Sequence, residues 1–281
     1  MNISHAIEET RNSLVRFRRG QKRVGLVPTM GALHEGHLSL VRAAKNQCDI
    51  VAVSLFVNPT QFGPQEDFSK YPRTFDHDRQ MLEEERVDLL FAPLIEEMYP
   101  QGTVTQVWVD GLSEKLCGRS RPGHFRGVTT VVCKLFHIIE PDAAFFGQKD
   151  AAQVAIIRRM VRDLNIPVEI LVCPILREPD GLAMSSRNAY LDPQERKSAL
   201  VLYRALIRVQ ELFNHGERNS GRLISAGKEI FSHQPGVRLD YFEIVDPENL
   251  DPLSQISQKS LVAVAAFVGT TRLIDNLELS P

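Results

Sequence analysis

The sequence of 281 residues predicts an α/β protein, with a Rossmann-like doubly wound parallel sheet and a smaller α+β domain at the C-terminus. Up to about residue 180, short apolar runs alternate with amphipathic helical patterns, which is typical of parallel βαβ units. After about residue 187, two helical patterns precede three neighbouring apolar runs, which is typical of an α+β unit. We therefore expect one domain over residues 1–180 and a small lid domain over residues 181–281.

The first domain is expected to open with an amphipathic helix around residues 3–15 and then to alternate between strands and helices. Its strands are expected at residues 24–27, 50–57, 88–92, 143–146 and 168–172. Its further helices are expected from residue 35 or 36, and at residues 76–86, 128–139 and 151–164. The run at 50–57 is almost continuously apolar, as in parallel strands that are covered on both faces.

The second domain is expected to contain helices at residues 193–215 and 221–232. Its strands are expected at residues 239–245, 261–268 and 272–277. Ligands of open parallel sheets bind at the carboxyl ends of the strands. The polar motifs of this chain follow predicted strands or precede predicted helices, so we expect them to form a ligand site at that edge.

The composition predicts a soluble cytoplasmic protein that binds neither nucleic acid nor a membrane. Hydrophobic residues make up 43% and charged residues 24% of the chain, with a net charge of -2. That balance gives no bulk attraction to polyanions. The four cysteines include no Cys-x-x-Cys pair, so they indicate neither a zinc site nor a disulfide framework. The longest apolar run, at residues 261–268, is far shorter than the ~20 residues that span a bilayer.

The stretch at residues 28–38 (Pro-Thr-Met-Gly-Ala-Leu-His-Glu-Gly-His-Leu) joins a predicted strand to a predicted helix through a glycine turn. Backbone N–H groups and the positive end of the helix dipole make such a turn a ready anion site. His34 and His37 are three residues apart, so both imidazoles can face that site. This pattern indicates chemistry in which negative charge moves between phosphates. The pair could also be surface decoration or half of a metal site.

Two further loops carry polar groups. Asn58 and Gln61 follow the second strand in a proline-fixed turn, and amides of this kind can read hydroxyls and carboxylates. A plain Asn-Pro turn is the alternative. Arg119, Arg121 and Arg126 cluster around a Pro-Gly-His sequence, which indicates either an anion-facing loop or a solvated basic loop.

Two more motifs contain cations or hydroxyls beside glycine. In residues 145–153 (Phe-Phe-Gly-Gln-Lys-Asp-Ala-Ala-Gln), Lys149 can reach a phosphate, and Asp150 can either cap a helix or accept from a ribose. In residues 183–188 (Ala-Met-Ser-Ser-Arg-Asn), two hydroxyls and an arginine could clamp a phosphate. On its own, the second stretch could be a serine-rich turn.

All five motifs, in this order, resemble the pantothenate synthetase family of the nucleotidyltransferase superfamily. His-Glu-Gly-His at residues 34–37 resembles the His-x-Gly-His element that the superfamily shares with class I aminoacyl-tRNA synthetases. Met-Ser-Ser-Arg-Asn at residues 184–188 occupies the place of the synthetases' Lys-Met-Ser-Lys-Ser loop. The chain departs from the family pattern at Gln148, where glutamate is usual, and at Ala152, where glutamine is common.

The resemblance implies an ATP-dependent ligase that joins pantoate to β-alanine through a pantoyl adenylate and releases AMP and pyrophosphate. It implies catalytic roles for His37, His34, Lys149 and Arg187. It implies an ATP site made of Met30, Gly31, His34, His37, Gly147, Lys149, Asp150, Leu176, Met184, Ser185, Ser186 and Arg187. It implies that Gln61 and Gln153 bind pantoate, with Asn58 nearby. Mg²⁺ would be carried by the ATP phosphates, and the family implies a homodimer.

Two alternatives of other classes stay open at this point. A nucleotidyltransferase acting on a phosphorylated acceptor would need more basic residues near the acceptor than Asn58, Gln61 and Gln153 supply. A nucleotide-binding sensor without chemistry would not need the histidine pair, Lys149 and Arg187.

Overall fold

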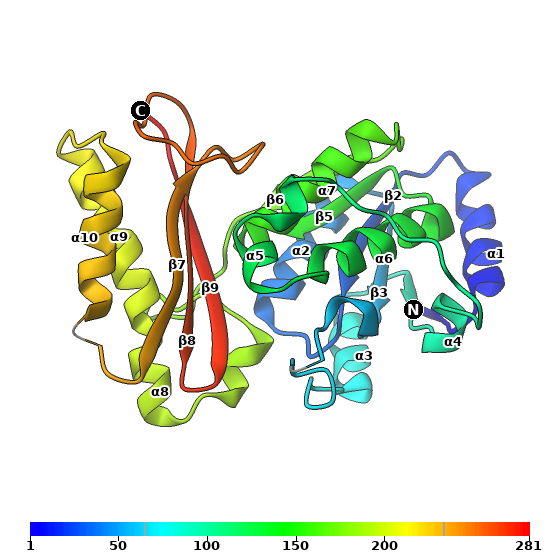
Figure 1. Ribbon diagram of the computed structural model, residues 1–281. Coiled ribbons are helices and arrows are strands. Elements are labelled where there is room, and N and C mark those ends of the chain that lie inside the picture. Colours follow the sequence, from blue (N-terminus) through cyan, green and yellow to red (C-terminus); the bar gives the residue numbers. More distant parts are fainter. Residues whose placement is uncertain (65, 233) are drawn as a thin grey trace. The chain divides into compact units, whose positions relative to one another are not determined.

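The computed structural model describes residues 1–64, 66–232 and 234–281, and the chain forms two compact units (Figure 1). The first unit consists of Met1–Ser113, Arg121–Gly147 and Ile156–Pro174. The second consists of Glu114–Ser120, Gln148–Ala155 and Ile175–Pro281. This division differs from the expected one at residues 180 and 181, because two earlier segments of the chain pack with the C-terminal strands.

The first unit contains a six-stranded parallel sheet in the order β1-β4-β3-β2-β5-β6. Its strands are β1 (Asn2–Ser4), β2 (Val24–Thr29), β3 (Ile50–Leu55), β4 (Leu89–Phe91), β5 (Ala143–Gly147) and β6 (Glu169–Cys173). The five strands predicted for this domain are confirmed to within two residues at each end. The sixth, β1, was not predicted, because the opening helix was expected to begin at residue 3. Asn2 to Ser4 instead pair with Leu89 to Phe91, and the helix begins at Ile7.

The helices that alternate with these strands confirm the predicted βαβ order. They are α1 (Ile7–Arg18), α2 (Glu35–Gln47), α3 (Phe75–Glu84), α4 (Ile95–Met98), α5 (Cys117–Ser120), α6 (His124–Ile139) and α7 (Ala151–Asp163). The basic stretch at residues 119–127, which was expected to be a loop, is partly helical. Helix α6 begins at His124 rather than at residue 128, and Gly127 lies within its first two turns.

The topology places the first predicted motif at the switch point of the sheet. Strand β2 lies between β3 and β5, and the chain adds β3 and β4 on one side and β5 and β6 on the other. Ligands of doubly wound sheets bind at the carboxyl ends of the strands where the strand order reverses. The turn after β2 and Gly147 at the end of β5 both lie there.

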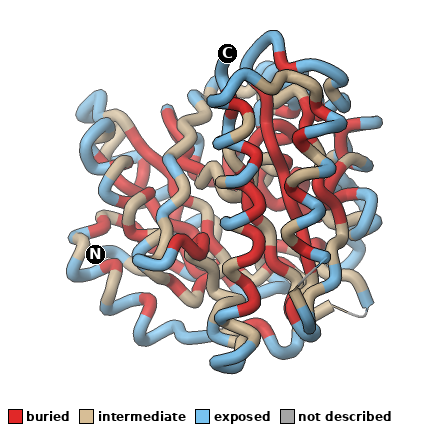
Figure 2. The backbone as a smooth tube through the Cα atoms, turned by 90° about the vertical axis from the view of Figure 1, so that its left-hand side faces the viewer, coloured by how far each residue is buried: buried red, intermediate tan, exposed pale blue. Residues whose placement is uncertain are grey.

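The second unit contains the antiparallel sheet β7-β8-β9 and, besides α5, three helices from the C-terminal part of the chain. These C-terminal elements are α8 (Pro193–Ser198), α9 (Leu200–Asn214), α10 (Ser220–Ser232), β7 (Val237–Val245), β8 (Ser260–Val268) and β9 (Thr271–Leu279). The single helix expected at residues 193–215 is interrupted at Ala199, although the backbone there keeps helical angles. Buried residues follow the strands, and exposed residues follow the outer faces of the helices and the loops (Figure 2).

Candidate active site

The glycine turn after β2 is held by a buried carboxylate. Asp78 in α3 has no exposed surface, and its two oxygens accept from the backbone nitrogens of Ala32 and Leu33 at 2.9 and 2.8 Å. Gly31 (φ +82°) and Ala32 (φ 50°) adopt left-handed angles, and a side chain on Gly31 would lie 3.0 Å from Asp78 Oδ2. The turn therefore has a fixed shape. It also differs from the expected anion site, because Asp78 already occupies two of its amides.

The histidine pair caps helix α2. His34 Nδ1 accepts from the backbone nitrogen of Gly36 at 3.1 Å, and His37 Nδ1 accepts from that of His34 at 3.3 Å. The two rings lie 4.1 Å apart between centroids. Because each Nδ1 accepts a hydrogen bond, each neutral ring carries its proton on Nε2. The two imidazoles lie side by side at the start of α2, and each ring carries an Nε2–H donor.

The amides after β3 form a buried network. Asn58 is 1% exposed; its Nδ2 donates to Gln61 Oε1 and to the carbonyl of Gly127, both at 3.1 Å. Its Oδ1 accepts from Thr60 and from the hydroxyl of Tyr99. Gln61 is 8% exposed. Asn58 therefore positions Gln61, because its own polar atoms are engaged inside the protein.

The same network brings Gln61 beside the glycine turn and beside α6. Gln61 Nε2 lies 2.8 Å from the sulfur of Met30, which belongs to that turn. A Cβ on Gly127 would come within 2.3 Å of the carbonyl oxygen of Thr60, so only glycine allows α6 to approach so closely. The structure thus brings together Met30, Gln61 and Asn58, as the motifs predicted.

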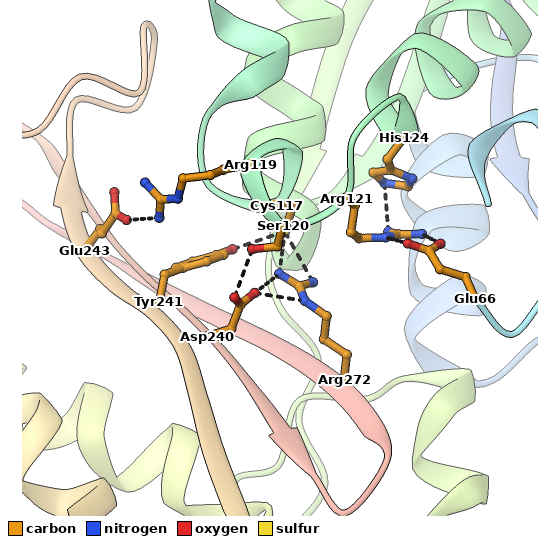
Figure 3. Close-up of polar contacts among 10 residues, drawn as sticks. All are labelled: Glu66, Cys117, Arg119, Ser120, Arg121, His124, Asp240, Tyr241, Glu243 and Arg272. Atoms are coloured by element: carbon orange, nitrogen blue, oxygen red, sulfur yellow. Dashed lines mark hydrogen bonds and ion pairs between the residues drawn. The ribbon is translucent and has the colours of Figure 1, made fainter. Parts of the chain in front are cut away.

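Arg121 and His124 hold the backbone of Gln61. His124 Nδ1 donates to the Gln61 carbonyl at 2.8 Å, and Arg121 donates to the same carbonyl at 3.3 Å. Arg121 also forms a paired contact with both oxygens of Glu66, at 2.8 and 2.6 Å (Figure 3). Burial raises the pKa of Glu66, but the hydrogen bonds and charge of Arg121 outweigh it and leave that pKa below its usual value. Arg121 therefore supports the Gln61 turn rather than standing open to an anion.

Arg119, the preceding arginine, belongs to the second unit. It pairs with Glu243, while Ser120 donates to Asp240 at 2.9 Å (Figure 3). The buried thiol of Cys117 lies 3.1 Å from the hydroxyl of Tyr241, in the same strand as these acidic residues. Two of the three clustered arginines are thus neutralised by carboxylates, and Arg126 is exposed. Of the two alternatives for this stretch, the anion-facing loop would therefore have only one exposed arginine that no carboxylate among the described residues neutralises.

In the second unit, two predicted motifs line one cavity. Lys149 lies in the 3₁₀ turn Gln148–Asp150 that leads into α7, and Ser185 precedes the 3₁₀ turn Ser186–Tyr190. Both line a small cavity together with Asn188 and Asp275. The Oδ1 atom of Asn188 is buried and has no hydrogen-bond partner among the described residues. Two residues predicted to bind phosphate, Lys149 and Ser185, are therefore brought together in this unit.

The loop that carries Ser185 is braced from both sides. Ser185 Oγ accepts from the backbone nitrogen of Arg187 at 3.3 Å, and Asn188 Nδ2 donates to Glu178 and to the carbonyl of Ala183. The carbonyl of Leu176, a residue expected in the ATP site, accepts from the backbone nitrogen of Met184 at 3.0 Å. Asp150, Gln153, Ser186 and Arg187 are all partly exposed.

Three positions in these sites were not found from the sequence: Asp78, Gly127 as a contact of Thr60, and Asn276, which contacts the Lys149 turn. The only sequence signal for the last was a polar pair, Asp275 and Asn276, inside an apolar strand. Across residues 1–64, 66–232 and 234–281, no three His, Cys, Asp or Glu side chains are grouped to hold a metal ion. No helix in these ranges is long and apolar enough to cross a membrane.

The profile of the Pantoate-beta-alanine ligase family matches residues 2–278. The chain belongs to this family. A pantothenate synthetase of Koribacter versatilis is 60% identical over 279 residues, 99% of this chain and 96% of the relative. A pantothenate synthetase of Thermotoga neapolitana is 57% identical over 276 residues, 98% of this chain and 99% of the relative.

Solved structures of pantoate-beta-alanine ligases share the fold as well. The pantothenate synthetase of Thermus thermophilus superposes with a TM-score of 0.96 at 48% identity, covering 100% of both chains. The ligase of Francisella tularensis, complexed with beta-gamma ATP and beta-alanine, superposes with a TM-score of 0.80 at 35% identity. That match covers 99% of this chain and 97% of the Francisella chain. The resemblance seen in the motifs and the predicted fold class are both confirmed.

Proposed function

We propose that this enzyme condenses (R)-pantoate with β-alanine to form pantothenate, a precursor of coenzyme A, while ATP is cleaved to AMP and pyrophosphate. The observation that carries the proposal is the family match over residues 2–278, a range that contains all five motifs. The relative complexed with ATP and β-alanine supports the choice of these two substrates. The enzyme is an acid–amino acid ligase that forms a carbon–nitrogen bond.

The reaction proceeds in two steps. A carboxylate oxygen of pantoate attacks the α-phosphorus of ATP, the bond to the bridging oxygen breaks, and pyrophosphate leaves. The amine of β-alanine then attacks the carbonyl of the adenylate, the bond to the AMP oxygen breaks, and the nitrogen loses a proton. No protein side chain forms a covalent bond, so positioning and charge stabilisation supply the rate.

The phosphates are held by His34, His37, Lys149 and Arg187. The Nε2–H groups of the histidines, set by their Nδ1 contacts, donate to oxygens whose charge grows as pyrophosphate departs. His37 is the main donor. Lys149 supplies a mobile positive charge. The remaining ATP contacts come from Met30, Gly31, Gly147, Asp150, Leu176, Met184, Ser185 and Ser186.

Pantoate is bound by Gln61 and Gln153, whose amides can each donate to and accept from its polar groups. Asn58 acts on Gln61 through the 3.1 Å bond between their side chains. Mg²⁺ would arrive with ATP, since Mg²⁺ prefers phosphate oxygens and water to an all-protein cage.

The segment around residues 175–190 acts as the hinge of a lid, and ATP binding should slow hydrogen exchange in residues 184–188. Unchanged exchange with bound ATP would exclude the lid.

We further propose that the enzyme is a cytoplasmic homodimer. Besides the family resemblance, the dimer is supported by the segment at residues 103–109, which lies in no helix or strand and in which Val104 is 87% and Trp108 is 39% exposed. Exposed apolar side chains that lie close together mark a candidate contact with another chain. Sedimentation equilibrium should give twice the chain mass, and Val104→Asp should shift it toward the monomer. A monomeric wild type would refute the dimer.

The ligase function is tested by the steady-state release of AMP. Release should require ATP, pantoate and β-alanine together, and pantothenate should form in equal amount. A nucleotidyltransferase would ignore both pantoate and β-alanine, and a sensor would release nothing. Steady AMP release that continues at the same rate without β-alanine would refute the ligase.

A further inference from the structure

The side chain of Asn276 in β9 binds the main chain of the turn that carries Lys149. Asn276 is 3% exposed, and its Nδ2 donates to the carbonyls of Gln148 and Lys149, both at 2.9 Å. Its Oδ1 accepts from Gln148 Nε2 at 3.3 Å. The amide can have only this orientation, because a carbonyl accepts hydrogen bonds and never donates them. Asn276 thus makes three contacts with one turn.

The neighbouring residue, Asp275, fixes the position of Asn276. Its backbone nitrogen donates to Asp275 Oδ1 at 2.8 Å, and the Asp275 carboxylate accepts from both terminal nitrogens of Arg177, at 2.7 and 3.0 Å. Arg177 also donates to the carbonyl of Gly181 at 3.0 Å. The buried part of β9 is therefore a rigid support, and a displaced Asn276 would need several other bonds to break.

A lysine ammonium lies at the end of four flexible bonds, so its range depends on where the main chain begins. Lys149 lines the same cavity as Ser185 and Asp275. The Gln148–Asp150 turn contains only three residues, and Asn276 binds two of its carbonyls.

We propose that Asn276 is a positioning residue for Lys149, holding the lysine main chain so that the ammonium reaches the ATP phosphates. Asn276 itself touches no substrate. The inference rests on the proposed function, in which Lys149 binds those phosphates. Gln148 makes the third and longest contact, in which its side-chain amide donates to Asn276 Oδ1. The ionised glutamate that is usual at this position has no N–H group and could not donate this hydrogen bond. The two main-chain contacts are independent of the residue at position 148.

The proposal is tested by a double-mutant cycle on pantoate-dependent exchange of labelled pyrophosphate into ATP. Asn276→Ala should lower the exchange kcat by about 10- to 100-fold, the scale of a misplaced catalytic group, and leave the KM for pantoate unchanged. Lys149→Ala should also lower it. The double variant should be no slower than Lys149→Ala alone, because a positioning residue has nothing left to position once the lysine is gone.

Two controls separate positioning from general damage. Gln148→Ala removes the 3.3 Å contact without adding a charge and should keep exchange within about threefold of wild type. Asn249→Ala, in a turn of the same unit where the side chain accepts from Asp251, should leave exchange unchanged. Thermal unfolding establishes that each variant is folded. Should Asn276→Ala not fold, Asn276→Asp replaces it in the cycle, because it keeps the volume and loses the donor.

Each outcome decides one of the claims. Losses that multiply in the double variant, or a folded Asn276 variant with wild-type exchange, would overturn the positioning role while leaving the ligase intact. Full activity of Lys149→Ala would also overturn it. Absence of exchange in the wild-type protein, with pantoate and ATP both present, would instead count against the proposed function.

Discussion

Replacing Asp78 by alanine should destabilise the first unit more than any loss of one surface charge. The change leaves the backbone N–H of Leu33 buried without its acceptor and also removes the acceptor of the partly buried N–H of Ala32. An unsatisfied buried group costs roughly 1–3 kcal/mol, so the loss at Leu33 alone should lower the free energy of unfolding by roughly that amount. The hydroxyl of Thr74, which donates to Asp78 Oδ1 at 3.1 Å, loses its partner as well.

The assay is urea unfolding followed by circular dichroism, with Asp76→Ala as the matched control. Asp76 lies in the first turn of the same helix but is exposed, so its loss should cost no more than about 1 kcal/mol. Native-state hydrogen exchange gives a local readout, because the amides of Ala32 and Leu33 should exchange faster in Asp78→Ala. Equal unfolding free energies for the two variants would refute the assignment of Asp78 as the support of the glycine turn.

Three further predictions concern the site residues and their supports. His37→Ala should lower turnover by about 10²- to 10³-fold with the fold unchanged, as for other lost transition-state donors. Near-normal turnover would show that the histidine pair has no catalytic role. Gln61→Ala and Gln153→Ala should weaken pantoate by roughly 1–3 kcal/mol and ATP far less, whereas equal losses in titration calorimetry would indicate misfolding. The folded pKa of Glu66 is lowered, so its contribution to stability is present above its usual value of 4.5 and is lost as the pH falls through the lower folded value. The stability gap between wild type and Glu66→Gln should therefore shrink with acidification, and a constant or growing gap would contradict that sign.

The sequence predicted where several candidate residues lie, because three of the motifs stand where a strand ends and a helix or 3₁₀ turn begins. The periodicity of apolar residues and the glycine turn predicted β2, the turn and α2. The three-residue spacing of His34 and His37 indicated that both rings lie at the start of that helix, where they cap it. Gly147 directly follows the strand predicted at residues 143–146, so it was expected at the carboxyl end of that strand. The strand is β5, which pairs with β2. These features depend on local sequence, so they could be predicted.

The features that could not be predicted depend on contacts between distant residues. In the sequence, Asp78 cannot be told apart from the other acidic residues of its helix. Its support of the glycine turn follows only from its burial and from its hydrogen bonds with Ala32 and Leu33. The three clustered arginines read as a single basic loop. Their partners, Glu243 and Glu66, lie far away in sequence and belong to different units.

The central claim is that pantoate is activated on ATP before the amine reacts. Its most direct measurement is the exchange of labelled pyrophosphate into ATP with Mg²⁺ and pantoate present and β-alanine absent. We expect rapid exchange, because the first step needs only the carboxylate and the residues that hold the phosphates, and we expect free AMP to accumulate steadily only after β-alanine is added. Exchange that strictly required β-alanine would contradict the two-step mechanism, even if pantothenate were the product.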